Sequence, residues 1–223
     1  MSGPLSCRKR VRPSYNNFVA PVQSNRRSRP YPTRPDRSPM RQHGPWTILS
    51  SRTVYCDPWL SVRRDEVIRP DGGDGTYATV EIKAGVSVLA VDDQMRAYLT
   101  SEFHYAVGRV TLEAVSGGID QDETPPEAAA RELREELGIE AGDLVDLGTI
   151  DPFTASILSP TRLYLARDLN FGQPRPEGTE TIQPVRMPIA EAVEAAIDGR
   201  ITHAPSCALV LKAAVELGVL RRA

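Results

Sequence analysis

The sequence has few cysteines and no long apolar segment. Its 223 residues include three cysteines, which are scattered and odd in number: Cys7, Cys56 and Cys207. This pattern shows neither a disulfide framework nor the spacing of a cysteine metal site, so we expect a protein of a reducing compartment, the cytoplasm. No apolar run approaches the roughly 18 residues that span a bilayer, and the N-terminus lacks the apolar core of a secretory signal. These absences argue against a disulfide scaffold and against a membrane protein.

The first 43 residues lack a periodic apolar pattern and are almost free of acids. They hold ten of the 27 Lys and Arg residues, seven of the 19 prolines and a single acid, Asp36. Such a composition cannot bury a core, so we predict a disordered basic tail over 1–43. It could be a nucleic-acid tether or a transit peptide, although the prolines argue against an amphipathic transit helix. We favour an inert or non-native tail, with Met40 as a possible true start.

The remaining residues, 44–223, carry an excess of acids, which disfavours nucleic acid as a partner. They alternate strand patterns with helices. A small antiparallel unit of three strands is predicted over 44–84, with a strong turn signal at 70–75. Residues 85–223 predict an α/β/α sandwich around a mixed sheet, so the fold class is α/β. Strands are expected over 46–56, 60–69, 76–83, 86–91, 96–101, 109–115, 144–150, 161–166 and 183–187, and helices over 125–137, 189–198 and 205–217.

The central helix is predicted with signals at both ends. Thr124 suits the N-cap, Glu127 completes a capping box, and Pro125 falls at the first helical position, where its missing N–H is no loss. Gly138 can adopt the left-handed conformation that ends a helix. The apolar stripe of this helix must pack against another element; it consists of Ala129, Leu133 and Leu137.

Three glutamates at spacing i, i+3, i+4 share one side of this helix: Glu132, Glu135 and Glu136. Like charges at this spacing repel, and a plain surface helix would normally interleave basic residues. Hard cations such as Mg²⁺ bind carboxylate oxygens together with water and substrate phosphates. On the residues alone, a metal site and a solvated acidic face both account for the cluster.

The segment from Gly117 to Ile139 resembles the signature of the Nudix hydrolases. It matches Gly-x5-Glu-x7-Arg-Glu-Leu-x-Glu-Glu-x-Gly-Ile at every fixed position. The resemblance implies hydrolysis of a nucleoside diphosphate linked to another moiety, with Mg²⁺ or Mn²⁺ as cofactor. It implies metal ligands at Glu132, Glu135 and Glu136, with Glu135 and Arg131 counted among the catalytic residues. Gly117 and Glu123 would support the signature, and Arg131 would hold the loop and helix together by ion pairing.

Outside the signature, about residues 45–217 resemble the ADP-ribose pyrophosphatase branch. The matching stretches are 101–109, 112–113, 116–120 and 199–206. In that branch the leading strands help to form a homodimer, and the carbonyl of the residue before the first signature glycine, here Ser116, joins the metal ligands. A glutamate from a later loop is the general base there. Among the acids in this part of the chain, Glu180 matches its position just before a strand; the other candidates are Asp151, Asp168 and Glu177.

Four residues are candidate substrate contacts by the same resemblance. Trp46 and Tyr77 align loosely with aromatic residues that sandwich adenine across the dimer, although the reading of each as a packed strand residue is favoured. Gly118 would lie against the substrate. His104 stands where the branch often has an arginine for the phosphates, and the loop 151–160 lacks the glycine and acid often found there. Both departures bear on ADP-ribose specificity and leave the metal chemistry untouched.

The sequence therefore predicts metal-dependent hydrolysis of the pyrophosphate bond of a small nucleoside diphosphate sugar similar to ADP-ribose, which would yield AMP and ribose 5-phosphate. Alternatives with the same chemistry are another nucleotide sugar, a dinucleotide or a damaged nucleotide. A non-catalytic sensor of nucleotide sugars is a different class of function. Sensors of that kind usually lose signature carboxylates, and all of them are present here.

Overall fold

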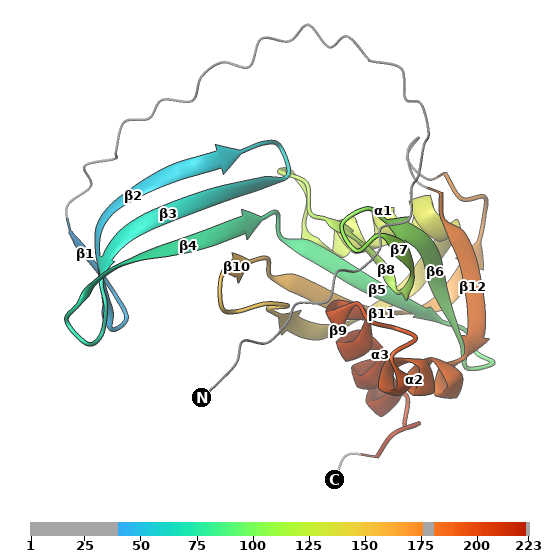
Figure 1. Cartoon of the computed structure of the whole chain (residues 1–223). Helices are drawn as coiled ribbons and strands as arrows, with labels where there is room; N and C mark the ends of the chain where they lie inside the picture. The colour runs from blue at the N-terminus through green and yellow to red at the C-terminus, as the bar shows by residue number, and fades with distance from the viewer. Residues whose placement is uncertain (1–39, 176–180, 222–223) are drawn as a thin grey trace, which may run out of the picture. The chain divides into compact units, whose positions relative to one another are not determined.

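The computed structural model describes residues 40–175 and 181–221. Within this part of the chain it forms two sheets and three helices (Figure 1). The elements are β1 (Arg41–His43), β2 (Trp46–Cys56), β3 (Leu60–Ile68), β4 (Asp74–Ile82), β5 (Gly85–Val91), β6 (Arg96–His104), β7 (Arg109–Glu113), β8 (Val115–Gly118), α1 (Pro125–Leu137), β9 (Ile139–Ile150), β10 (Ile157–Leu158), β11 (Thr161–Phe171), β12 (Gln183–Pro188), α2 (Ile189–Asp198) and α3 (Ala204–Glu216). No helix of these residues is long and apolar enough to cross a membrane.

The first sheet has the strand order β1-β2-β3-β4-β10. Its centre, β2 to β4, is the antiparallel three-strand unit predicted from the sequence. Two short strands extend it: β10 pairs parallel to β4, and β1 pairs with β2 through Arg41 and Ile48. β1 lies inside the segment 1–43 that was predicted as a disordered tail, so that prediction fails for residues 41–43. Backbone pairing of an edge strand needs no apolar pattern, which is why composition missed it.

The second sheet is mixed and has the order β12-β6-β5-β11-β9. Its central strand, β5, runs antiparallel to β6 and β8 and parallel to β11. The single strand predicted over 109–115 is divided into β7, which pairs with β6, and β8, which pairs with β5. Ala114 separates them, and its N–H is taken by the Ser206 hydroxyl at 2.9 Å instead of a ladder partner.

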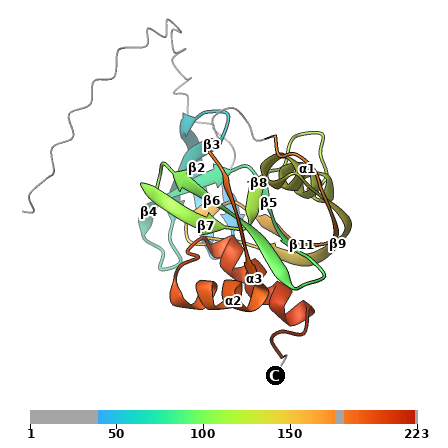
Figure 2. The ribbon, with the colours of Figure 1, turned by 90° about the vertical axis from the view of Figure 1, so that its right-hand side faces the viewer.

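Both faces of this sheet are buried. Along β5, Val86, Val88 and Ala90 belong to the core under α1, whereas Leu89 and Val91 belong to the core under α2 and α3. The alternation follows from the two-residue period of a strand. Figure 2 shows α1 on one side of the sheet and α2 with α3 on the other. The α/β/α sandwich predicted from the sequence is therefore confirmed.

The helices lie where they were expected, with α3 shifted by one residue. The largest difference concerns β9, which begins at Ile139 instead of residue 144. It starts directly after the helix-ending Gly138 and pairs with β11 as far as Phe171, so β11 is also longer than predicted. This long pair carries the chain from β11 to the C-terminal end of α1.

Candidate active site

Helix α1 is held at both ends by the signals read from the sequence. The backbone N–H of Thr124 donates to Glu127 Oε2 at 2.8 Å, which forms the capping box. Gly138 has φ 65°, and its N–H donates to the carbonyl of Arg134 at 3.0 Å. The apolar side packs on the sheet through Ala129, Leu133 and Leu137, all buried. The adjoining acidic side is thereby fixed next to β8 and the loop that follows it.

Arg131 connects this loop to the helix because its guanidinium group donates several hydrogen bonds to both. Its Nε and Nη2 donate to the two carboxylate oxygens of Glu123 at 2.9 and 3.0 Å, and Nη2 also donates to the carbonyl of Gly118 at 3.0 Å. Its Nη1 donates to Glu132 Oε1 at 2.8 Å and to Glu135 Oε2 at 3.1 Å. The hydrogen bond from Arg131 holds the pKa of Glu123 below its usual range, and the same contact raises the pKa of Arg131. Planar guanidinium geometry makes such a fork possible, which a lysine could not provide.

Gly117 is required by a close approach of Glu132 to the backbone. A Cβ atom at Gly117 would lie 1.9 Å from Oε1 of Glu132. Any side chain at this position would displace the Glu132 carboxylate from β8. The first glycine of the signature therefore places that carboxylate beside the residue before it, Ser116, whose carbonyl is a predicted metal ligand.

The donor chemistry of this region fits a hard divalent cation. Glu132 and Glu136 are largely removed from solvent, with the Glu132 side chain 14% exposed and Glu136 8% exposed. With Glu123 and Glu135 they form a group of four carboxylates against one guanidinium, and carboxylate oxygens are the ligands that Mg²⁺ and Mn²⁺ prefer. However, no three His, Cys, Asp or Glu side chains of residues 40–175 and 181–221 converge closely enough to hold a metal ion. The ligand roles of the three glutamates and Ser116 therefore stay predictions.

A cavity of about 530 Å³ opens beside these carboxylates, and we call it the signature cavity. Six predicted site residues line it: Ser116, Gly117, Gly118, Arg131, Glu132 and Glu135. Three residues without a role in the sequence analysis line it too, namely Trp59, Lys83 and His203. Lys83 Nζ donates to Asp120 Oδ1 at 2.5 Å, which lowers the pKa of that carboxyl group. The cavity therefore combines carboxylates with an amine, an indole and an imidazole.

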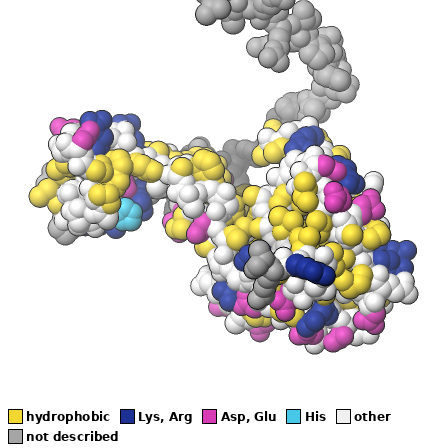
Figure 3. Space-filling view, turned by 90° about the horizontal axis from the view of Figure 1, so that it is seen from below, with side chains coloured by type: hydrophobic (Ala, Val, Ile, Leu, Met, Phe, Trp, Pro, Cys, Tyr) yellow, Lys and Arg dark blue, Asp and Glu magenta, His cyan; other side chains and the backbone are white. Residues whose placement is uncertain are grey.

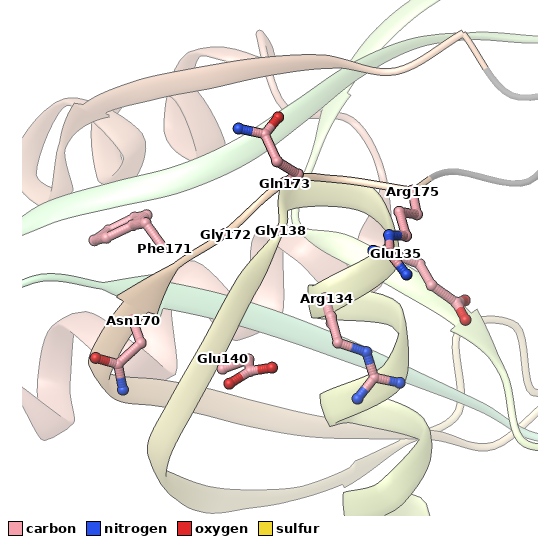
Figure 4. A pocket seen from close by; sticks show the side chains of 9 residues that line it. All are labelled: Arg134, Glu135, Gly138, Glu140, Asn170, Phe171, Gly172, Gln173 and Arg175. Carbon is pink, nitrogen blue, oxygen red and sulfur yellow. The ribbon is translucent and has the colours of Figure 1, made fainter.

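A second cavity, of about 630 Å³, lies at the C-terminal end of α1. Figure 4 shows Arg134, Glu135 and Arg175 among the residues that line it. The backbone N–H of Arg175 donates to the carbonyl of Glu135 at 2.8 Å, so the chain after β11 runs against the end of the helix. Glu180, the predicted general base, lies outside the described residues, as does the alternative candidate Glu177.

Trp46 and Tyr77 do not line the signature cavity. They contact each other edge to face, with ring centroids 5.4 Å apart and planes at 74°, and the Tyr77 hydroxyl donates to the carbonyl of Ala155. Both border a separate cavity of about 700 Å³, which is lined by residues of the first sheet and by residues 154–156. An adenine sandwich formed by these rings across a dimer stays a prediction.

His104 also lies outside the walls of the signature cavity and belongs to a network around Glu113. Its Nε2 lies 3.3 Å from Glu113 Oε1, while His203 Nδ1 lies 3.1 Å from Glu113 Oε2. Thr111 Oγ1 donates to Glu113 at 2.6 Å, and Ser206 Oγ lies 2.8 Å from His203 Nδ1. Glu113 and His203 lie in the stretches 112–113 and 199–206 that resemble the branch, but the sequence alone assigned them no role. They are 90 residues apart, so only the tertiary structure brings them together.

The comparisons with known proteins agree with this geometry. Residues 46–80 match the family described as the nucleoside diphosphate sugar hydrolase N-terminal domain, and residues 81–208 match the NUDIX domain. The chain is 35% identical over 178 residues to the ADP-ribose pyrophosphatase of Mycobacterium tuberculosis, covering 77% of this chain and 84% of the relative. It is 33% identical over 153 residues to the ADP compounds hydrolase NudE of Escherichia coli, covering 66% and 80%.

Two further similarities are more distant. The chain is 27% identical over 177 residues to a CMP-5'-(N-acetyl-N-hydroxy-3-aminopropyl)phosphonate hydrolase of Streptomyces rubellomurinus, covering 79% of this chain and 85% of the relative. A crystal structure of an ADP compounds hydrolase superimposes with a TM-score of 0.69 at 24% identity, covering 78% of this chain and 95% of the other. The last likeness shows the fold alone. The match of the NUDIX domain over more than half of the sequence shows that the chain belongs to the Nudix family.

Proposed function

We propose that the protein hydrolyses the pyrophosphate bond of a nucleoside diphosphate sugar with the help of Mg²⁺ or Mn²⁺. The observation that carries the proposal is the complete signature from Gly117 to Ile139, with Glu132 and Glu135 at the wall of the signature cavity. The names of the relatives from M. tuberculosis and E. coli support an ADP-linked compound as substrate. ADP-ribose, cleaved to AMP and ribose 5-phosphate, is the first substrate to test.

The residues of the signature would have two roles, which are to bind the cation and to hold the cation ligands in place. A bound divalent cation would neutralise phosphate charge and lower the pKa of a water molecule. Glu132, Glu135 and Glu136, with the carbonyl of Ser116, would hold that cation. Arg131 would keep two of these carboxylates in place, because it contacts Glu132 and Glu135 directly.

Two further side chains at the wall of this cavity suit a nucleoside diphosphate. Lys83 brings a positive charge beside Gly118, where phosphate oxygens can reach it. Trp59 is 74% exposed and offers the cavity an aromatic face. Stacking of a base on such a face contributes about 1–3 kcal/mol. Within one chain, Trp59 is therefore better placed than Trp46 or Tyr77 to contact the base of a substrate bound at the signature.

The general base remains Glu180 in this proposal. The carboxylates of the signature would be committed to the cation, so the proton of the attacking water needs another acceptor. The N–H of Arg175 is bonded to the carbonyl of Glu135, and Glu180 follows five residues later in the sequence. The chain thus enters the segment with Glu180 directly at the helix that carries the predicted ligands.

A homodimer in the cytoplasm completes the proposal. Apolar side chains lie exposed on and next to the first sheet, among them Val54, Tyr55 and Trp59. Figure 3 shows hydrophobic side chains on the surface of the molecule. Exposed apolar groups of this kind are typical of protein interfaces. Light scattering coupled to size-exclusion chromatography would measure the mass of the particle, and a purely monomeric protein at micromolar concentration would contradict the dimer.

A substrate panel tests the proposed function. The purified protein is incubated with ADP-ribose, other ADP-sugars, CMP-linked compounds and dinucleotides, each with Mg²⁺, with Mn²⁺ and with EDTA. We expect metal-dependent release of a nucleoside monophosphate, with ADP-sugars cleaved fastest. Full turnover in EDTA would contradict the metal, whereas tight binding of ADP-ribose without turnover in either metal would favour the sensor.

A further inference from the structure

The two ring nitrogens of His203 have different surroundings within the part of the chain that the structure describes. Its Nδ1 contacts both Glu113 Oε2, at 3.1 Å, and Ser206 Oγ, at 2.8 Å. Among the residues that the structure describes, Nε2 has no hydrogen-bond partner. Because the ring lines the signature cavity, this nitrogen is the part of His203 that can bind a ligand there.

The neighbours of His203 decide which nitrogen carries the proton. An ionised carboxylate only accepts hydrogen bonds, so the 3.1 Å contact between Glu113 and Nδ1 favours the tautomer with the proton on Nδ1, in which Ser206 Oγ acts as an acceptor. Burial lowers the pKa of His203, which favours the neutral ring, although the charge of Glu113 opposes this shift. A neutral ring with its proton on Nδ1 presents Nε2 as an acceptor. Phosphate oxygens at neutral pH are acceptors too, so this nitrogen does not suit the diphosphate.

The position of the ring is well defined. Ser206 Oγ accepts the N–H of Ala114 at 2.9 Å, which ties the first turn of α3 to the junction of β7 and β8. The same junction leads to Ser116, whose hydroxyl donates to the carbonyl of Ala114 at 2.9 Å. His203 and the predicted ligand Ser116 are therefore linked through hydrogen bonds that meet at Ala114. A group held at a fixed place beside the metal ligands is suited to selecting one end of the substrate.

We propose that His203 is a specificity-determining residue whose Nε2 accepts a hydrogen bond from a hydroxyl group of the sugar attached to the diphosphate. The inference rests on the proposed function, because it concerns the substrate of the same cavity. Glu113 and Ser206 act as positioning residues that hold the proton on Nδ1. An unpaired acceptor in a partly buried site disfavours ligands that bring no hydroxyl, so His203 selects nucleotide sugars over plain nucleotides.

Two substitutions of His203 distinguish the role of Nδ1 from the role of Nε2. In His203→Asn the side-chain amide can still donate to Glu113, but it is too short to replace Nε2. In His203→Gln the longer side chain can place its amide oxygen where Nε2 was. The probes are ADP-ribose and ADP, and their dissociation constants are measured by calorimetry in EDTA, where the proposed function predicts no turnover. Melting temperatures of both variants check that the fold is retained.

We expect His203→Asn to bind ADP-ribose about 10-fold more weakly than the wild type while its affinity for ADP is nearly unchanged. His203→Gln should keep most of the preference for ADP-ribose. With Mg²⁺ present, KM for ADP-ribose should rise in His203→Asn and kcat should change little. An equal loss of affinity for both probes would show a purely structural role, and a loss of kcat at unchanged affinity would show a role in proton transfer. Either result would overturn the inference.

The same measurements distinguish a failure of the proposed function from a failure of the inference about His203. A wild-type protein that binds ADP-ribose more tightly than ADP but does not hydrolyse it would contradict the proposed function and leave the selection by His203 intact. A wild-type protein that binds ADP at least as tightly as ADP-ribose would overturn the inference, because no contact to the sugar would then contribute to binding. If His203→Asn does not fold, His203→Gln and the two probes on the wild type still decide the question.

Discussion

Two networks meet at the signature cavity, and each is centred on a residue with several charged or polar partners. In the first, Arg131 joins Glu123, Glu132 and Glu135. In the second, Glu113 joins His104 and His203. The first network uses a guanidinium that is always charged, whereas the second uses imidazoles whose charge depends on their surroundings. A permanent cation suits a brace for metal ligands, and a neutral ring suits recognition of an uncharged group.

The two networks also differ in their range along the chain. Glu123 and Arg131 are eight residues apart, so one loop and two helical turns bring them together. Glu113 and His203 are 90 residues apart and meet only because α3 packs against the sheet next to β7. We therefore assign the chemistry to the short-range network and the selection of substrate to the long-range network. The following predictions test that division.

The largest expected effect is the loss of hydrolysis in Glu136→Gln. Glu136 is buried on the acidic side of α1, and the neutral amide would bind a divalent cation poorly. We expect turnover to fall below detection, while the melting temperature in metal-free buffer stays similar or rises, because like-charge repulsion is relieved. Steady-state assays and thermal melts measure the two quantities.

Glu194→Gln, an exposed glutamate on α2, is the matched control and should change neither quantity. Glu113→Gln should keep a measurable kcat, because Glu113 belongs to the network that we assign to recognition. If Glu113→Gln is as inactive as Glu136→Gln, the division between the two networks is wrong.

Glu180→Gln is expected to have the next largest effect. Loss of a general base lowers turnover by about 10²–10⁴-fold, and here KM and metal affinity should change little. The pH–rate profile of the variant should also lose its acidic limb. Glu177→Gln and Asp151→Asn are the controls, since both are acids in the later part of the chain.

A wild-type turnover in Glu180→Gln would exclude this residue as the base. If His203→Gln then lowered kcat, the network of Glu113, His104 and His203 would supply the base. Part of the chemistry would then belong to the network that we assign to substrate recognition. If Glu177→Gln lost turnover instead, the loop alignment would be displaced by three residues.

Much of the fold could be predicted because local signals agree with it. The capping box, Pro125 and Gly138 fixed the limits of α1, and the two-residue alternation in β5 matched a sheet covered on both faces. The failures were elements held by backbone pairing alone. β1 and β10 are two or three residues long and have no side-chain pattern, and β9 extends to Ile139 because β11 pairs with it.

The site was predictable to the extent that its residues lie close together in the sequence. The ion pairing of Arg131 between loop and helix was implied by the resemblance of the signature to its family. The close approach of Glu132 to Gly117 could be seen only in the structure. Trp59 and Lys83 carry no pattern of their own in the sequence. Their place at the cavity depends on how the first sheet continues into the second, which is a long-range property.

A smaller effect, on stability, is expected for Arg131→Met. The substitution leaves Glu123 without its partner, and both side chains are mostly shielded from solvent. Breaking a shielded ion pair of this kind costs about 2–3 kcal/mol, less than in a fully buried site because the group is partly exposed. Urea unfolding in metal-free buffer measures the change in the free energy of unfolding. Glu113→Gln should cost about 1 kcal/mol, as for a hydrogen bond between partly exposed groups.

A double-mutant cycle with Glu123→Gln isolates the pair. If Arg131→Met and Glu123→Gln add without coupling, Arg131 is not the brace that the distances indicate. If Glu113→Gln lowers the free energy of unfolding more than Arg131→Met does, the comparison of the two networks is also wrong. The network of Glu113 with His104 and His203 would then stabilise the fold more strongly than the network of Arg131.

The smallest expected effects are two separate losses of stability as the pH falls, one for each network. The folded-state pKa of Glu123 is lowered by the hydrogen bond from Arg131, so its contribution is complete above the unfolded value of about 4.3 and is lost as the pH falls below it. The pKa of His203 is lowered chiefly by burial, while the facing Glu113 raises it and His104 lowers it. Unfolding then takes up a proton, so stability is lost as the pH falls below about 6.5.

The two contributions can be separated by measuring the free energy of unfolding from pH 8 to pH 3 in metal-free buffer. His203→Gln should remove the part of the decline that begins near pH 6.5, and Glu123→Gln should remove the part that begins near pH 4.3. The difference between each variant and the wild type matters here, because other groups titrate in both. If the wild type and His203→Gln have parallel curves between pH 8 and pH 5, the fold does not lower the pKa of His203. If instead the wild type gains stability relative to His203→Gln as the pH falls over this range, the fold raises the pKa of His203. Its Nε2 would then donate to a phosphate oxygen, and both networks would face the substrate as cations.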